Sequence, residues 1–185
     1  MPTVRELSEK QSVNISRTRN AYATLKPFQL SVLAAMCAGL SIGAIGFATS
    51  HLVRGGTPAV VASMGAAAVI VFQFPQSPAA RVWPILGGHL VSALIGVTVS
   101  QLIPDRMIAS GVAVGLSLLA MAVCRCMHPP GGGTALVAVF GGAAIQDAGY
   151  GFVLLPTLIN ASLLAMFGSV FRLLTAKPSD DNLVR

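Results

Sequence analysis

Long apolar segments, separated by short links rich in glycine, proline or charge, fill this 185-residue chain from about residue 27 to residue 174. About 20 apolar residues in a helix are enough to cross the hydrocarbon core of a bilayer. Only 10% of the residues are charged, and the mean hydropathy is +0.75, which is too apolar for an ordinary soluble domain. The sequence therefore predicts a small all-α integral membrane protein.

About six transmembrane helices are expected, with a five-span bundle as the alternative. The apolar segments are 30–49, 57–74, 84–103, 107–124, 134–145 and 152–174. The segment 134–145 is too short to span at about 1.5 Å per residue. We therefore expect short or broken helices at 57–74 and 134–145, inside a single transmembrane domain of residues 27–174, with polar tails at 1–26 and 175–185.

The distribution of charge predicts the orientation. Twelve Lys and Arg against six Asp and Glu give a net charge of +6, and six spans would leave only Arg54 and Arg106 on the less basic side. The positive-inside rule then places both termini in the cytoplasm. A cell inner membrane is expected, with a plastid inner envelope as the alternative. Because the basic residues lie at the ends of apolar segments, they do not indicate nucleic-acid binding.

The chain contains a weak internal repeat. The stretch from Gly55-Gly56-Thr57 aligns with the stretch from Gly132-Gly133-Thr134, and nine of thirteen pairs are identical if Pro58 is an insertion. This predicts two inverted three-helix repeats, at about 27–103 and 107–174. Paired Gly/Pro-interrupted helices in inverted repeats are typical of a transport site near the membrane midplane. The N-termini of such helices would attract anions.

Three segments resemble those of a known family. They are Met127-His128-Pro129-Pro130-Gly131-Gly132-Gly133-Thr134-Ala135-Leu136, Phe74-Pro75-Gln76-Ser77-Pro78-Ala79-Ala80 and the Gly-His-x-x-Ser-Ala-x-x-Gly pattern of 88–96. Together they resemble the HPP family of small integral membrane proteins. The resemblance implies transport of nitrite or a similar small anion. The chain departs from the family in having Gly131 after the two prolines, and in placing Arg81 early in the Ser-Pro loop.

Residues near these motifs are the candidate substrate-binding residues. We expect the two prolines to hold the chain extended, and 131–133 to form a loop with free backbone donors. His128 would tune protonation, His89 would line the route, and Arg125 with Arg54 would concentrate anions at the two mouths. The full set is His128, Gly131, Gly132, Gly133, Thr134, Gly55, Gly56, Thr57, His89, Arg125, Arg54 and Asn160.

Other functions are left open. Cys124, Cys126 and His128 offer soft ligands for copper(I) or zinc, although the spacing is not that of a common zinc site. A structural or assembly protein of the membrane is the other alternative. The sequence has no P-loop, paired catalytic carboxylates or Ser/His/Asp arrangement, so neither an enzyme nor a cofactor is expected.

Small residues recur at helical spacing in three spans, as Gly39/Gly43, Gly111/Gly115 and Gly88/Ser92/Gly96. Such stripes let helix backbones approach closely in lipid. They predict either tight packing within the chain or the interface of a homo-oligomer.

Overall fold

The computed structural model describes residues 27–52 and 60–175, which form a bundle of helices without any strand in these two ranges. The helices are α2 (Pro27–Ser50), α3 (Ser63–Gln73), α4 (Val82–Leu102), α5 (Arg106–Val123), α6 (Pro130–Phe140), α7 (Ala143–Ala148) and α8 (Ile159–Thr175). A 3₁₀ turn, η1 (Pro78–Ala80), precedes α4, and a wider π-type turn, η2 (Val153–Leu158), precedes α8. The all-α expectation is confirmed.

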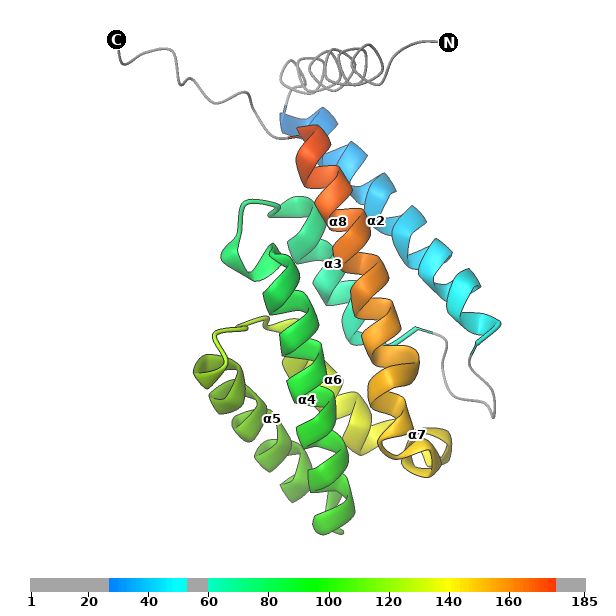
Figure 1. Cartoon of the computed structure of the whole chain (residues 1–185), viewed down its shortest axis with the longest axis vertical. Coiled ribbons are helices and arrows are strands. Elements are labelled where there is room, and N and C mark those ends of the chain that lie inside the picture. The colour runs from blue at the N-terminus through cyan, green and yellow to red at the C-terminus, as the bar shows by residue number, and fades with distance from the viewer. Residues whose placement is uncertain (1–26, 53–59, 176–185) are drawn as a thin grey trace, which may run out of the picture.

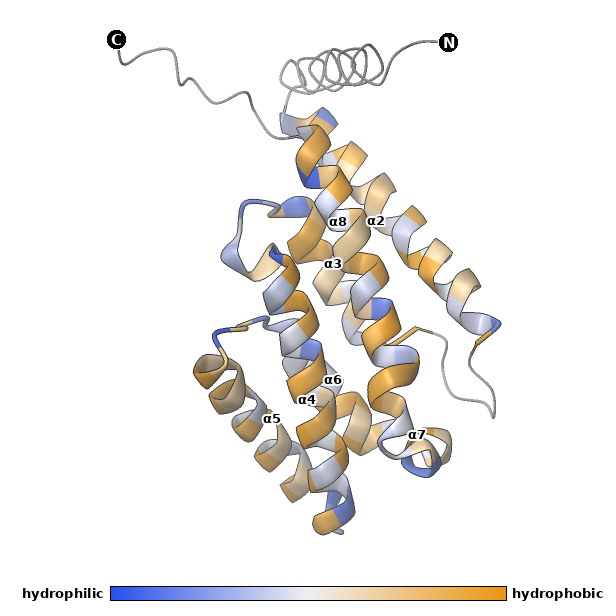
Figure 2. Cartoon of the chain, viewed as in Figure 1, coloured by the Kyte–Doolittle hydropathy of each residue, from blue (hydrophilic) through white to orange (hydrophobic). Residues whose placement is uncertain are grey.

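Four helical segments are long and apolar enough to cross a membrane: 27–50, 82–102, 106–123 and 153–175. They carry many exposed large apolar side chains, such as Phe28, Leu40 and Phe47 of α2, and Figure 2 shows apolar residues along the length of these helices. Lipid tails solvate such a surface, whereas water would not. The described chain therefore has the surface of a multi-pass membrane protein.

The two short helices, α3 and α6, have 11 residues each and span about 16 Å at 1.5 Å per residue. That is roughly half of a bilayer core. Figure 1 shows them starting near the middle of the molecule and running in opposite directions. Short helices were expected here, but the count of six spans and the inverted repeat are not confirmed and stay predictions.

The bounds of both short helices differ from those expected. Among the described residues of 57–74, only 63–73 is α-helical. The segment expected at 134–145 begins earlier, at Pro130, because proline suits the first turn of a helix, where its missing N–H costs nothing. It ends at Phe140, because Gly142 takes a φ of +80° and turns the chain into α7.

The sequence had suggested one regular helix for the last span, but the structure shows a break in it. Leu155 has φ −126° and ψ 118°, which breaks the helix ahead of Pro156. Proline inside a helix removes a hydrogen bond and clashes with the preceding turn. The regular part of this span is therefore α8, which begins at Ile159.

The proposed register of the repeat is wrong. It pairs Ser63 with Val139, but Ser63 is the first residue of α3 whereas Val139 lies in the last turn of α6. A Gly/Ala/Val-rich sequence matches itself easily at several offsets. An alignment based on the identical residue pairs therefore does not place the start of α3 on the start of α6.

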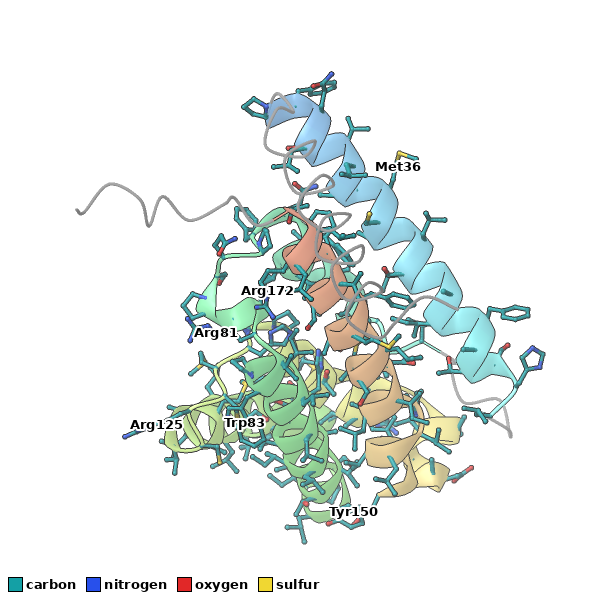
Figure 3. The ribbon with its side chains drawn as sticks, turned by 45° about the horizontal axis from the view of Figure 1, so that its top comes forward. Met36, Arg81, Trp83, Arg125, Tyr150 and Arg172 are labelled. Atoms are coloured by element: carbon teal, nitrogen blue, oxygen red, sulfur yellow. The ribbon has the colours of Figure 1, made fainter. Side chains whose placement is uncertain are left out.

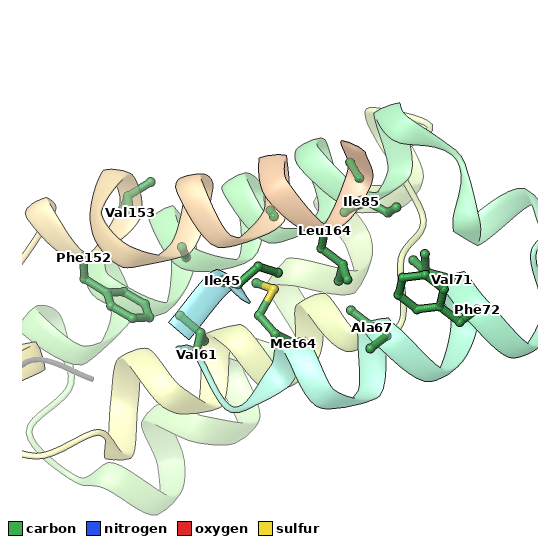
Figure 4. Packing of buried hydrophobic residues seen from close by; sticks show 14 of the residues in the cluster. Ile45, Val61, Met64, Ala67, Val71, Phe72, Ile85, Phe152, Val153 and Leu164 are labelled. Carbon is green, nitrogen blue, oxygen red and sulfur yellow. The ribbon is translucent and has the colours of Figure 1, made fainter. Parts of the chain in front are cut away.

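The main core surrounds α3. Met64, Ala67, Val71 and Phe72 on this helix are buried, and the helix contacts α2, α6 and α8. The ring of Phe72 meets Phe171 edge to face at 5.2 Å. Figure 4 shows this packing. The longer helices α2 and α8 thus help to bury one face of this half-length helix.

The three stripes of small residues differ in what they face. A Cβ placed on Gly96 of α4 would lie 2.7 Å from the Cβ of Ala138 on α6, so this stripe packs two helices within the chain. A Cβ on Gly39, Gly43, Gly111 or Gly115 would meet nothing within 4 Å in the described part of the chain. Tight packing within the chain, one of the two roles expected for these stripes, is thus confirmed for the stripe of α4 only.

Candidate functional site

The two short helices meet at their N-terminal turns. The hydroxyl oxygens of Ser63, the first residue of α3, and Thr134, in the first turns of α6, lie 2.6 Å apart in a hydrogen bond. A Cβ on the neighbouring Gly133 would lie only 3.2 Å from the Cβ of Ser63. Because helix N-termini carry partial positive charge, this junction brings two positive dipole ends to one buried point.

A histidine from a third helix joins the junction. The Nδ1 atom of His89, on α4, lies 2.7 Å from the Thr134 hydroxyl oxygen, and both residues are fully buried. The Thr134 hydroxyl therefore links α3, α4 and α6 in one hydrogen-bonded chain.

The second histidine lies beside the first. His128 donates from Nδ1 to the carbonyl oxygen of Ala79, 2.8 Å away, because a carbonyl can only accept. Neutral His128 therefore carries its proton on Nδ1 and leaves Nε2 as an acceptor. The rings of His89 and His128 are 5.0 Å apart between centroids, at 62° to one another.

Ser63, His89, His128 and Thr134 together are called the histidine cluster below. Each of them is at most 7% exposed. The Nε2 atoms of both histidines are buried and have no hydrogen-bond partner among the described residues. Buried polar atoms without a partner are rare in proteins and call for an explanation, such as a ligand or a functional role.

Glycines allow this packing. A Cβ on Gly88 would lie 2.6 Å from the Cβ of His128, and one on Gly131 would lie 2.8 Å from the Ser92 hydroxyl. A side chain at either position would push α4 away from the start of α6. The Gly-His pair on α4 thus contributes to the cluster in two ways. Gly88 lets α4 approach His128 closely, and His89 supplies an imidazole that contacts Thr134.

The glycine loop expected after His128 does not form. Pro129 is already helical, with φ −50° and ψ −38°, and 131–133 lie in the first turn of α6. The amides of Gly131 and Gly132 donate to the carbonyl oxygens of His128 and Pro129, at 2.8 and 3.1 Å. These two donors are therefore engaged in this conformation, and their role in anion binding stays a prediction.

Of the other candidate residues, the structure describes Gly132, Arg125 and Asn160. Gly132 faces α5, where its nearest neighbour is Val114. Arg125 is exposed and has a φ of +52° just after α5. Asn160 is fully buried in α8, and its part in the site stays a prediction. Arg54, Gly55, Gly56 and Thr57 lie outside the described residues.

The cysteine and histidine residues near 124–128 do not form a common ligand set. Within 27–52 and 60–175, no three His, Cys, Asp or Glu side chains gather in a way that would hold a metal ion. Cys124 is exposed and Cys126 is buried, while His128 turns its Nδ1 to Ala79. The three side chains therefore do not converge on one metal position in this conformation, and metal binding stays an untested alternative.

Sequence reasoning missed two members of the site, Ser63 and Ala79. Ser63 is the single polar residue within 58–72, and that signal was present in the sequence. The carbonyl of Ala79 carries none, because any residue supplies one. The tertiary structure shows that the Ser-Pro loop, the Gly-His pattern and the His-Pro-Pro turn all contribute to this cluster.

The comparisons with known proteins agree with a membrane location. A family model described as the transmembrane region of HPP matches residues 24–179. Two transmembrane proteins of Dictyostelium discoideum are similar to this chain. One is 32% identical over 111 residues, which are 58% of this chain and 39% of the relative. The other is 33% identical over 121 residues, which are 63% of this chain and 36% of the relative. The chain thus spans less than half the length of either relative. No solved structure matches it.

Proposed function

Because this chain belongs to the HPP transmembrane family, we propose that it is a multi-pass membrane transporter for a small monovalent anion, with nitrite as the first substrate to test. The observation that carries the proposal is the junction of α3 and α6 at the histidine cluster. Opposed half-length helices whose N-termini meet inside the bundle are the arrangement in which transporters bind anionic groups.

The chemistry of the cluster suits a weakly held polar solute. Two hydroxyls and two imidazoles offer hydrogen bonds in the interior of an apolar bundle, and two imidazole nitrogens have no partner among residues 27–52 and 60–175. Polar side chains inside a membrane are costly, and by default they mark a functional site. A transported ion must be bound well enough to enter and weakly enough to leave.

The cluster is closed in this conformation, because its side chains are almost fully buried. Passage through it requires α4 and the short helices to move apart. The proposal is therefore a gated transporter, and not a permanently open pore. Arg125, exposed beside the His-Pro-Pro turn, would raise the anion concentration near one mouth, and Arg54 would do so near the other. A homo-oligomer in the inner membrane is part of the proposal.

Flux measurements in proteoliposomes test the proposed function. The purified full chain is reconstituted, and uptake of nitrite, nitrate, formate, chloride and sodium is followed against protein-free vesicles, with and without a proton gradient. We expect at least one small anion to enter faster than in protein-free vesicles and sodium not to. Flux of sodium alone, or of none of these ions, contradicts the proposal.

A further inference from the structure

The membrane-embedded helices lack fixed charge around the histidine cluster. Helices α3, α4 and α6 contain no Asp, Glu, Lys or Arg. The only charged residue of α5 is Arg106, in its first turn, and the only one of α8 is Arg172, in its last turn. Both lie at helix ends. A permanently charged anion in the cluster would therefore have no fixed cation from these helices beside it.

The remaining titratable neighbours do not change this balance. Cys126 is buried next to Gly87 of α4, and a thiol that ionised there would add negative charge. Arg81, just before α4, is exposed, as is Arg125. Figure 3 shows Arg81 and Arg125 at the periphery of the bundle. The groups inside the cluster that can take up a proton are the two imidazoles.

The tautomer of His128 determines which kind of solute can form a hydrogen bond with the cluster. Its Nδ1–H is held by Ala79, so the unpartnered Nε2 of the neutral ring offers a lone pair. A bare anion would face that lone pair and be repelled. A solute with an acidic O–H would donate to it. Where the Ser63 hydroxyl donates to Thr134 and the Thr134 hydroxyl donates to Nδ1 of His89, the Nε2 of His89 carries a hydrogen and can donate to an acceptor oxygen of the solute.

We infer that the histidine cluster takes the conjugate base of a weak acid together with one proton, so that the substrate crosses as an electroneutral pair. This inference rests on the proposed function and names its substrate class: small oxyacids with one O–H and one X=O oxygen, such as nitrous or formic acid. One proton and one anion combine on the entry side, and the neutral acid donates to Nε2 of His128. The acid leaves on the other side and releases the same proton. A proton shared with the imidazole gives an imidazolium–anion pair of the same net charge.

Transport in proteoliposomes of the full chain tests the inference. Uptake of nitrite and formate is compared with that of nitrate and chloride, the anions of strong acids, while an internal pH dye counts protons. Vesicles without protein give the background, because small neutral acids cross lipid unaided. We expect nitrite and formate to exceed the background with one proton per anion, and nitrate and chloride to be at least tenfold slower. The rates should not respond to an imposed membrane potential.

Variants of the histidines test the site. His128→Asn places an amide nitrogen where Nδ1 lies, keeps a donor for Ala79 and removes Nε2. It should fold as the wild type in detergent and lose at least tenfold in nitrite flux. His89→Asn is the second variant, should the first not fold, and a similar loss is expected. The matched control is His51→Asn, since His51 is exposed at the end of α2 and should keep its flux.

The outcomes separate the two proposals. Nitrate or chloride transport as fast as that of nitrite, or transport driven by membrane potential, overturns the weak-acid inference and leaves anion transport intact. Wild-type flux in folded His128→Asn also overturns it. Absence of any protein-dependent anion flux removes the proposed function, and the inference falls with it.

Discussion

Thr134 is the residue on which the histidine cluster depends most directly. Its hydroxyl bonds both to Ser63, across the junction of the short helices, and to His89 on α4. Since all three side chains are buried, removing this hydroxyl leaves polar atoms that water cannot reach. Loss of a buried partner costs about 1–3 kcal/mol.

We therefore expect Thr134→Val to lower the stability of the protein by about 1–3 kcal/mol and to reduce anion flux. Thermal unfolding in detergent and proteoliposome uptake measure the two effects. Ser63→Ala and the double variant complete a thermodynamic cycle, in which residues in contact give a coupling of about 0.5–3 kcal/mol. Strict additivity would show that the two hydroxyls do not interact.

Arg125 combines an exposed charge with an unfavourable backbone. Its φ of +52° lies in the left-handed region, which costs a non-glycine residue roughly 1–2 kcal/mol. It follows the C-terminus of α5, where glycine is usual, and the amide of Cys126 closes the turn onto Met121. A functional role for the positive charge would explain why arginine stands at a position whose backbone favours glycine.

Arg125→Gly should therefore stabilise the protein by about 1 kcal/mol and lower anion uptake at low salt. Arg125→Ala is the matched variant, because it removes the same charge without relieving the backbone. Unfolding temperatures of the two should differ while their uptake rates agree. If both variants transport as the wild type does, the charge has no part in attracting anions.

At the scale of helices, the contact between α4 and α6 holds the site together. Gly96 is one of the small residues of this contact, and a Cβ there would lie 2.7 Å from Ala138 and 2.9 Å from the Ala135 backbone. At the far end of α6, Arg106 and Gln146 donate to the carbonyl oxygens that the helix end leaves free, those of Val139 and Ala138. The helix is thus held at both of its ends.

Gly96→Ala should destabilise the protein by about 1–3 kcal/mol, the usual cost of overpacking, and disturb the cluster through α6. Gly111→Ala on α5 is the control, since no atom of the described part of the chain lies within 4 Å of its added Cβ and alanine favours a helix by about 0.5–1 kcal/mol. Unfolding in detergent compares them. Equal stabilities would contradict the close approach of α4 and α6.

At the scale of the molecule, the described chain begins and ends on one side. Figure 1 shows the start of α2 and the end of α8 at the same end of the bundle, and the end of α4 at the opposite end. Figure 3 shows Trp83 near the start of α4 and Tyr150 toward the other end. Trp83 donates to the Cys124 carbonyl at 3.2 Å, and aromatic residues of this kind are typical of the two membrane interfaces.

Cysteine labelling tests this arrangement. In a variant without native cysteines, Gln29→Cys and Thr175→Cys should react with an impermeant maleimide from the same side of sealed vesicles, and Gln101→Cys from the opposite side. Gel shifts with and without detergent give the result. Labelling of Gln29→Cys and Thr175→Cys from opposite sides would contradict the fold.

Segment length and hydropathy alone were enough to predict the membrane class, the four long spans and the short helices in the second and fifth apolar segments, because these local properties decide whether a helix can cross a bilayer. The sequence also singled out His89, His128 and Thr134. The folded arrangement was needed to show that these three residues meet Ser63 and the Ala79 carbonyl. It was also needed to show that 131–133 lie in the first turn of a helix and that the last span is broken ahead of Pro156. Contacts between distant segments depend on which helix faces which, and apolar segments of similar composition do not encode that choice in any local pattern.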